Sequence, residues 1–176
     1  MFSTPQALTV KTGQGATVRD SFEDFYERHK DGVLRAVFVA SGDVEAAQDA
    51  VDEAFTRAFQ HWARIQDHPS AVAWVTRTAL NTLTSSWRRR AKMVVGSVPD
   101  RGVDPELPID RSLVLAVLDL PERQRQVVAL RILLDLSIDE TARTLGIAPG
   151  TVTAHLSRAT AALRSSLNEE VVNDGV

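Results

Sequence analysis

The sequence predicts an all-α protein of two small helical domains joined by a flexible linker, the C-terminal domain being a helix-turn-helix. Apolar residues recur every three or four positions along several long segments, and no useful length of sequence alternates as a strand does. Residues 94–111 hold three prolines and two glycines, which break helices. We therefore expect a disordered leader (1–18), an N-terminal domain (19–93), this linker, a C-terminal domain (112–168) and a tail (169–176).

Composition narrows the class of protein. The chain has 176 residues, 44% of them hydrophobic, which suits a soluble globular protein, and it contains no cysteine, so disulfides and thiol chemistry are excluded. No stretch approaches the roughly 20 apolar residues of a membrane span, and the polar N-terminus lacks the apolar run of a signal peptide. We expect a cytoplasmic protein without membrane insertion.

Two helices open the N-terminal domain. Asp20 or Ser21 is the expected N-cap of the first, which Gly42 ends, and Asp43 caps the second, expected over Val44–Arg64. An apolar stripe on the second helix predicts its core side. The opposite face is acidic and carries Glu45, Asp49, Asp52 and Glu53. Such a face is either plain solvent surface or a docking site for a basic partner.

A third long helix, capped by Ser70, is expected from Ala71 to about Lys92 after a short loop over residues 66–69. Its tryptophans alternate with arginines, and it ends in the run Arg88–Arg90. Aromatic rings beside arginines suit single-stranded nucleic acid, because bases stack on rings while guanidinium groups hold phosphates. A single tryptophan in such a helix is more often a core residue than a stacking platform for a base.

The C-terminal domain begins with expected helices over 112–118 and 122–134 and then shows a helix-turn-helix pattern. Ser137 and Glu140 form a capping-box pair, Gly146 suits the left-handed turn, and Pro149 suits the first turn of a second helix. The outer face of that second helix is polar, with Thr151, Thr153, His155, Ser157 and Arg158. These side chains can hydrogen-bond to phosphates and base edges.

The ordered set of motifs resembles the extracytoplasmic-function (ECF) group of bacterial RNA polymerase sigma factors. The resemblance covers nearly the whole folded chain, and no single fragment carries it. The matching fragments are 22–29, 47–55, 73–81 and 87–90 before the linker, and 120–128 and 150–159 after it. The family pattern has a Lys-Ser-Arg-like run where this chain has Thr153-Ala154-His155, which implies fewer phosphate contacts.

The resemblance implies a promoter-specificity subunit that binds core RNA polymerase and promoter DNA, needs no cofactor or metal, and has an anti-sigma factor as a further partner. The clamp coiled coil of the largest polymerase subunit would be bound by Asp49, Asp52 and Glu53. The melted −10 element would be read and held by Asp67, His68, Arg77, Asn81, Arg88, Arg89 and Arg90. The −35 element would be read in the major groove by Thr151, Thr153, His155 and Arg158.

Three alternatives remain open at this point. A free-standing helix-turn-helix regulator would explain the C-terminal domain and leave the acidic helix and the basic third helix without a role. An adaptor would bind polymerase without opening promoters. An enzyme is disfavoured, because the four histidines are scattered and the chain has no cysteine and no glycine-rich phosphate loop.

Overall fold

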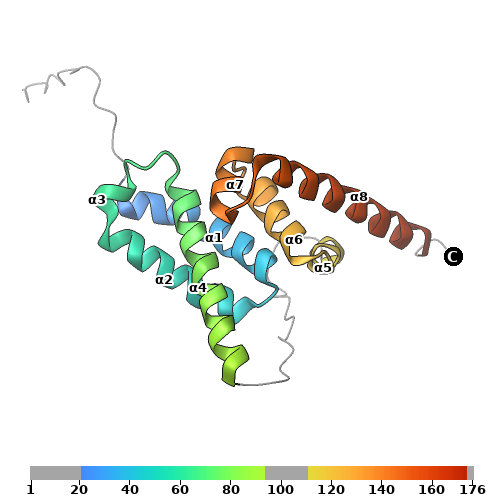
Figure 1. Ribbon diagram of the computed structural model, residues 1–176, viewed down its shortest axis with the longest axis horizontal. Helices are drawn as coiled ribbons and strands as arrows, with labels where there is room; N and C mark the ends of the chain where they lie inside the picture. The colour runs from blue at the N-terminus through green and yellow to red at the C-terminus, as the bar shows by residue number, and fades with distance from the viewer. Residues whose placement is uncertain (1–20, 94–110, 174–176) are drawn as a thin grey trace, which may run out of the picture.

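The computed structural model describes residues 21–93 and 111–173, and these parts of the chain contain helices and no strand, which confirms the all-α prediction (Figure 1). The elements before the linker are α1 (Phe22–Ser41), α2 (Val44–Gln60), α3 (Trp62–Ile65) and α4 (Ala71–Met93). Those after it are α5 (Arg111–Leu118), α6 (Glu122–Val128), the π-helical turn η1 (Ala129–Leu133), α7 (Ile138–Leu145) and α8 (Pro149–Asn173). The expected leader and almost all of the expected linker lie outside the described residues.

The first two helices begin and end where capping chemistry predicts. The hydroxyl of Ser21 accepts a hydrogen bond from the backbone N–H of Asp24 at 3.1 Å, and the Asp43 carboxylate accepts one from Ala46 N–H at 2.9 Å. Between the helices, Gly42 adopts φ 76°, a left-handed conformation that costs glycine least. Local side-chain chemistry therefore fixes this αα corner.

Two elements differ from the expected helices. The helix predicted over Val44–Arg64 stops at Gln60, because His61 leaves helical geometry (φ −120°, ψ 20°) and the short α3 follows. The helix expected to end near Leu167 continues to Asn173, so most of the predicted tail is helical. Periodicity alone could not locate either end, since neither position carries a glycine or a proline.

The helix expected over residues 122–134 changes type halfway. It is an α-helix through Val128 and then a π-helical turn, η1. A π-helical turn contains extra residues, so side chains after it face a new direction. Leu133, which the α-helical pattern would place inside, is 37% exposed, and its neighbour Ile132 is 65% exposed.

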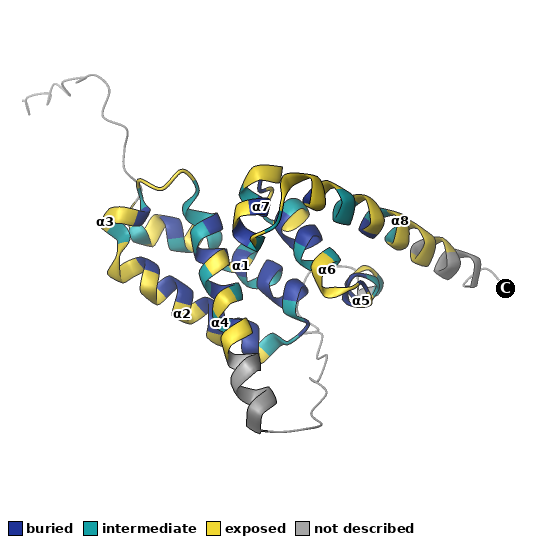
Figure 2. Ribbon diagram, in the orientation of Figure 1, coloured by how far each residue is buried: buried dark blue, intermediate teal, exposed yellow. Residues whose placement is uncertain are grey.

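The two regions share one hydrophobic core. Helix α1 lies in the middle, with α2 and α4 packed on one side and α6 and η1 on the other, while α7 lies against α4 (Figure 1). Most buried side chains of both regions form a continuous cluster, and the outer faces of α2 and α8 are among the exposed parts of the surface (Figure 2). A Cβ built on Gly32 of α1 would lie 3.7 Å from Leu134 Cδ2, in van der Waals contact across the two regions.

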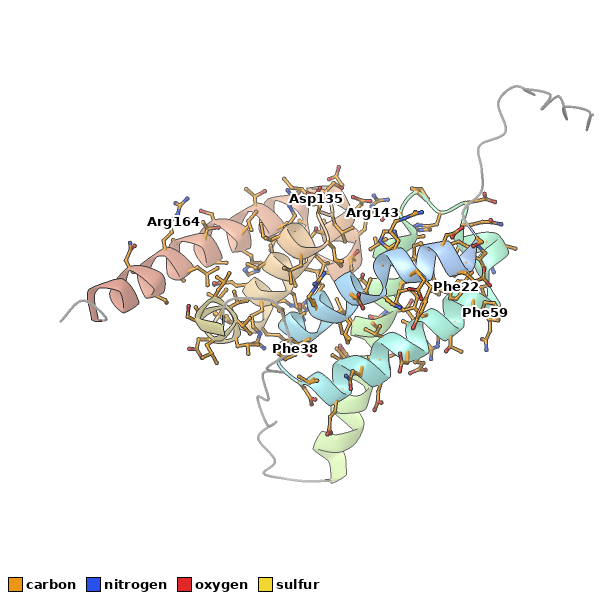
Figure 3. The ribbon with its side chains drawn as sticks, turned by 180° about the vertical axis from the view of Figure 1, so that it is seen from behind. Phe22, Phe38, Phe59, Asp135, Arg143 and Arg164 are labelled. Carbon is orange, nitrogen blue, oxygen red and sulfur yellow. The ribbon has the colours of Figure 1, made fainter. Side chains whose placement is uncertain are left out.

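Aromatic rings close the end of the N-terminal region where α1 begins. Phe22 contacts Phe59 with ring centroids 5.1 Å apart and Trp62 at 5.6 Å (Figure 3). These contacts connect the start of α1 to the end of α2 and to α3, and each edge or tilted pair contributes about 0.5–1.5 kcal/mol. Phe59 nonetheless remains 60% exposed.

We predict that Gly42→Ala lowers the free energy of unfolding by about 1–2 kcal/mol, because alanine is strained at positive φ. The added methyl group itself has room, since its nearest neighbour, Leu118 Cδ2, is 3.6 Å away. Urea unfolding followed by circular dichroism measures the effect. Gly150→Ala is the matched control, because Gly150 is helical with nothing within 4 Å, and it is expected to be neutral or stabilising. Equal unfolding midpoints for the two variants would contradict the prediction.

Candidate polymerase and nucleic-acid interfaces

Helix α2 separates its acidic residues from its core residues. All four expected acidic side chains, those of Glu45, Asp49, Asp52 and Glu53, are exposed. The opposite side of α2 is lined with buried alanines and packs on α1 and α4. The small alanine side chains let α2 pack closely on α1 and α4. The long polar side chains lie on the opposite side of α2 and point outward.

The charges on this face are not equally available. Glu53 forms an ion pair with Arg57 one turn later, which offsets part of its charge. No ion pair to Asp49 or Asp52 occurs among the described side chains. The neighbouring cation on α1, Lys30, instead forms an ion pair with Glu27 at 2.8 Å, and the hydrogen bond that Lys30 donates to that carboxylate raises the pKa of Lys30. Asp49 and Asp52, together with Glu45, therefore present negative charge on α2 that no ion pair among the described residues offsets.

The start of α4 and the loop before it form a polar surface. Arg77 and Asn81 are exposed and, being four residues apart, lie on the same face of α4. His68 is exposed in the loop, where its Nδ1 accepts a hydrogen bond from Ser70 N–H at 3.1 Å, and Asp67 beside it is exposed too. The expected capping role of Ser70 is confirmed, because its hydroxyl accepts from Ala73 N–H at 3.3 Å.

Four of the seven expected −10 residues thus lie on adjoining surface. The side chains of the other three, Arg88, Arg89 and Arg90, lie outside the described residues, although the backbone of α4 continues through them to Met93. In the sequence they follow Asn81 along the same helix.

The helix-turn-helix has the expected corner. Ser137 and Glu140 form both hydrogen bonds of the capping box, at 3.2 Å and 2.8 Å, and Gly146 ends α7 with φ 66°. The pKa of Glu140 is lowered, first by the hydrogen bond from the Ser137 side chain and next by the one from its backbone N–H. The carboxylate form of Glu140 is therefore the one that stabilises the start of α7.

The outward face of α8 carries most of the expected −35 residues. Thr151, Thr153 and Arg158 are exposed, whereas Val152 is fully buried against α7. His155 differs, because it is half-buried and its Nδ1 is buried with no hydrogen-bond partner in the described part of the chain. Its ring is directed partly into the domain, so it presents less to a ligand than the three other residues do.

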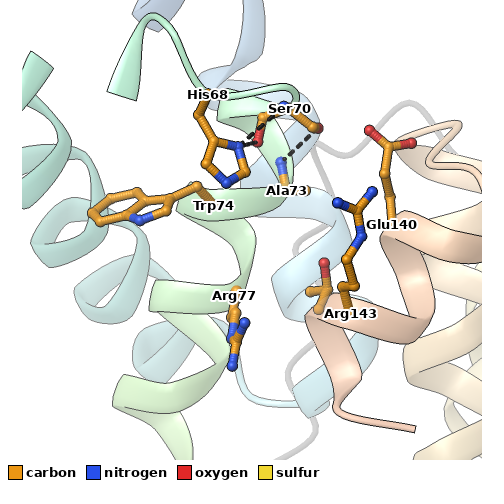
Figure 4. Close-up of a pocket in the computed structure, with 8 residues that line it drawn as sticks. His68, Ser70, Ala73, Trp74, Arg77, Glu140 and Arg143 are labelled. Carbon is orange, nitrogen blue, oxygen red and sulfur yellow. Dashed lines mark hydrogen bonds between the residues drawn. The ribbon is translucent and has the colours of Figure 1, made fainter. Parts of the chain in front are cut away.

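A small pocket lies between α4 and α7, where the two regions meet (Figure 4). Its walls are formed by His68, Ser70, Ala73, Trp74 and Arg77 on one side and by Glu140, Arg143 and Thr144 on the other. The Ser70 side chain also lowers the pKa of Glu140 by hydrogen bonding, after the two bonds from Ser137. Sequence reasoning missed this contact, because no local pattern connects two residues 70 positions apart.

The described residues hold no group of three or more histidines or carboxylates that could bind a metal ion. None of the helices in residues 21–93 and 111–173 is both long enough and apolar enough to cross a membrane.

Comparison with known proteins gives the same division of the chain. The family model for sigma-70 region 2 matches residues 25–93, and that for sigma-70 region 4 matches residues 110–163. The chain is 36% identical over 151 residues to the RNA polymerase sigma-E factor of Streptomyces coelicolor, covering 83% of this chain and 85% of that one. It is 32% identical over 168 residues to the ECF sigma factor SigL of Mycobacterium tuberculosis, covering 90% and 95%.

Two solved structures share the fold. The sigma factor RpoE of Bartonella quintana, solved with the anti-sigma factor NepR, superimposes with a TM-score of 0.68 at 21% identity, over 83% of this chain and 98% of that one. CnrH, solved with the cytosolic domain of CnrY, gives 0.58 at 22% identity, over 84% and 88%. Together with the two relatives above 30% identity, these matches show that the chain belongs to the ECF group of sigma-70 factors, which direct promoter-specific transcription initiation.

Proposed function

We propose that this sigma factor binds core RNA polymerase through the acidic face of α2 and contacts promoter DNA at two separate places. The first DNA contact is made by the exposed face of α4 with the loop before it, and the second by the start of α8. One observation carries the proposal: exposed carboxylates gather on α2, whereas the exposed polar and basic residues expected to contact DNA lie on α4 and α8.

The acidic face suits a basic protein surface and opposes DNA. Asp49 and Asp52 are exposed and carry charge that no described side chain offsets by an ion pair. Phosphates would be repelled there, while complementary positive charge on a protein would be steered toward it. The clamp coiled coil of the largest polymerase subunit is the partner we assign to this face.

The α4 surface suits the melted −10 element. An asparagine amide both donates and accepts hydrogen bonds, so exposed Asn81 can read the edge of an unstacked base. Arg77 on the same face, and the arginine run that follows, would hold the phosphates of the displaced strand. Rigid placement by a helix keeps these groups in register with successive nucleotides.

The α8 surface suits duplex DNA at the −35 element. A helix-turn-helix places the N-terminal residues of its second helix against base edges in the major groove. Thr151, Thr153 and Arg158 are exposed along that part of α8 and carry these contacts in our proposal. His155 keeps a smaller role, because its ring is partly turned inward.

The case for a partner beyond polymerase and DNA rests on one of the similar solved structures, because RpoE of Bartonella quintana was solved with the anti-sigma factor NepR. We propose an anti-sigma factor for this chain too. We place the action of this sigma factor in the cytoplasm. Polymerase catalyses transcription there, and the sigma factor contributes promoter recognition without an enzymatic step of its own. The alternative assignment as a free-standing regulator is not favoured, since it gives the acidic face of α2 no role.

We predict that Asp49→Ala combined with Asp52→Ala weakens binding to core polymerase at least tenfold, because truncating charged partners in an interface typically costs about 2 kcal/mol or more. Titration of labelled protein with core enzyme measures the affinity. The double variant Glu23→Ala with Glu122→Ala changes net charge equally on other exposed sites and should bind normally. Normal binding by the α2 variant would remove this face from the interface.

We predict that Asn81→Ala reduces promoter opening roughly tenfold while leaving polymerase affinity unchanged, since a lost pair of hydrogen bonds to a base edge costs about 1–3 kcal/mol. Permanganate reactivity of unstacked thymines in the −10 region reports opening directly. Asn168→Ala, the same change at an exposed position of α8, is the control. A parallel loss of polymerase binding would mean that Asn81 does not read the strand.

We predict that Arg158→Ala weakens binding of the assembled polymerase to promoters that need the −35 element and lowers the salt slope of binding by about one. Arg164→Ala removes the same charge more than one turn farther from the start of α8 and should have a smaller effect. Nitrocellulose filter binding at several salt concentrations measures both. Identical slopes for the two variants would show that only general charge matters.

A further inference from the structure

The outward face of α8 is centred on two residues that have no polar side chain. Val152 is fully buried, and each residue of an α-helix turns the chain by about 100°. Gly150 and Ala154, two positions to either side of Val152, therefore lie on the opposite face of the helix. Gly150 is exposed, and nothing outside its own stretch of helix lies within 4 Å of where its Cβ would be. The centre of this face thus offers one methyl group and the backbone.

Thr153, beside this centre, is polar, but its proton is already used. Its Oγ1 donates a hydrogen bond to the backbone carbonyl of Pro149, one turn earlier, at 3.3 Å. The hydroxyl therefore has no donor left for a base. Because the oxygen is held back against the helix, the methyl group is the part of this exposed side chain that is left for a base. The next exposed polar side chains on this face, Ser157 and Arg158, come one turn later.

One base carries a group in the major groove that matches such a surface. Thymine has a C5 methyl group, which the methyl groups of alanine and threonine contact favourably, whereas the other base edges there are hydrogen-bond donors and acceptors. A methyl group placed against a donor or an acceptor removes water from it and returns no hydrogen bond. Thr153 and Ala154 are consecutive residues, so their methyl groups reach one thymine or two adjacent ones.

We infer that α8 reads the −35 element mainly through thymine methyl groups, which Thr153 and Ala154 contact. This inference rests on the −35 role proposed above for α8, and it names the chemical group that the helix recognises. Arg158, one turn later, holds a phosphate. Base choice and general affinity are therefore supplied by different residues of the same helix.

The probe is uracil, which lacks only the methyl group of thymine and pairs with adenine in the same way. Assembled polymerase carrying this sigma factor first selects its −35 sequence from a randomised duplex pool. Each −35 thymine, on either strand, is then replaced singly by uracil. We expect one or two of these replacements to weaken binding about threefold to fivefold, because burial of a methyl group is lost. Equal affinity for uracil and thymine at every −35 position, measured by fluorescence anisotropy, would overturn the inference.

Two variants separate the methyl group of Thr153 from its hydroxyl. Thr153→Val keeps a methyl group and removes the hydroxyl, so the loss of affinity caused by uracil should remain. Thr153→Ser combined with Ala154→Gly removes both methyl groups and keeps the hydroxyl, so uracil and thymine promoters should bind equally. The reverse pattern would mean that the hydroxyl reads the base, and it would overturn the inference.

The matched control makes the same two changes seven residues farther along α8. Thr160 also donates its hydroxyl to a carbonyl one turn earlier, that of Leu156, at 2.8 Å, and Ala161 is exposed. Thr160→Ser with Ala161→Gly alters helix propensity in the same way, about 10 Å from the reading positions. The effect of uracil should persist in this control. Its disappearance there would contradict the assignment to Thr153 and Ala154.

A scrambled −35 element separates this inference from the function on which it rests. Scrambling is expected to weaken binding of the assembled polymerase more than any single uracil does. If scrambling weakens binding while uracil changes nothing, α8 reads the element through other groups and only the methyl inference fails. If scrambling itself has no effect, the −35 role proposed for α8 fails with it.

Discussion

Burial on all sides of the C-terminal part of α1, residues 36–40, is the constraint on which the rest of this structure depends. Five consecutive residues, Ala36 to Ala40, are buried, and five residues exceed one turn of a helix. A helix hydrophobic all round must be surrounded, and α2 with α4 covers only part of it. The second region supplies the remaining cover through α6 and η1. One helix of the first region therefore determines where the second region rests.

This constraint gives an energetic meaning to separating the regions. Opening the molecule would return Leu130 and the α1 residues beneath it to water, at about 25 cal/mol for each Å² of apolar surface. Surface of this kind is stable in an open state only when another protein covers it. Any partner that separates the two regions must therefore cover the apolar surface that the shared core now buries.

The sequence predicted those features that depend on neighbouring residues. The caps at Ser21 and Asp43 and the left-handed glycines depend on side chains within one turn, and all were expected. The break at His61 and the π-helical turn were missed, because no glycine or proline marks either place in the sequence. The contact between Ser70 and Glu140 is non-local, and no periodicity encodes it. The acidic face and the α4 surface were identifiable because charge and exposure follow the helical repeat.

The position of α2 suggests an order of events. Its buried side packs on α1 and α4, and the main contacts of the second region are with α1 and α4, so Asp49 and Asp52 stay exposed while the regions are joined. The face proposed to bind polymerase is therefore accessible without any prior opening. The surface proposed to read the −10 element, by contrast, is partly covered by α7. Since only the first of these two proposed contacts is accessible while the regions are joined, we expect binding to polymerase to precede reading of the promoter.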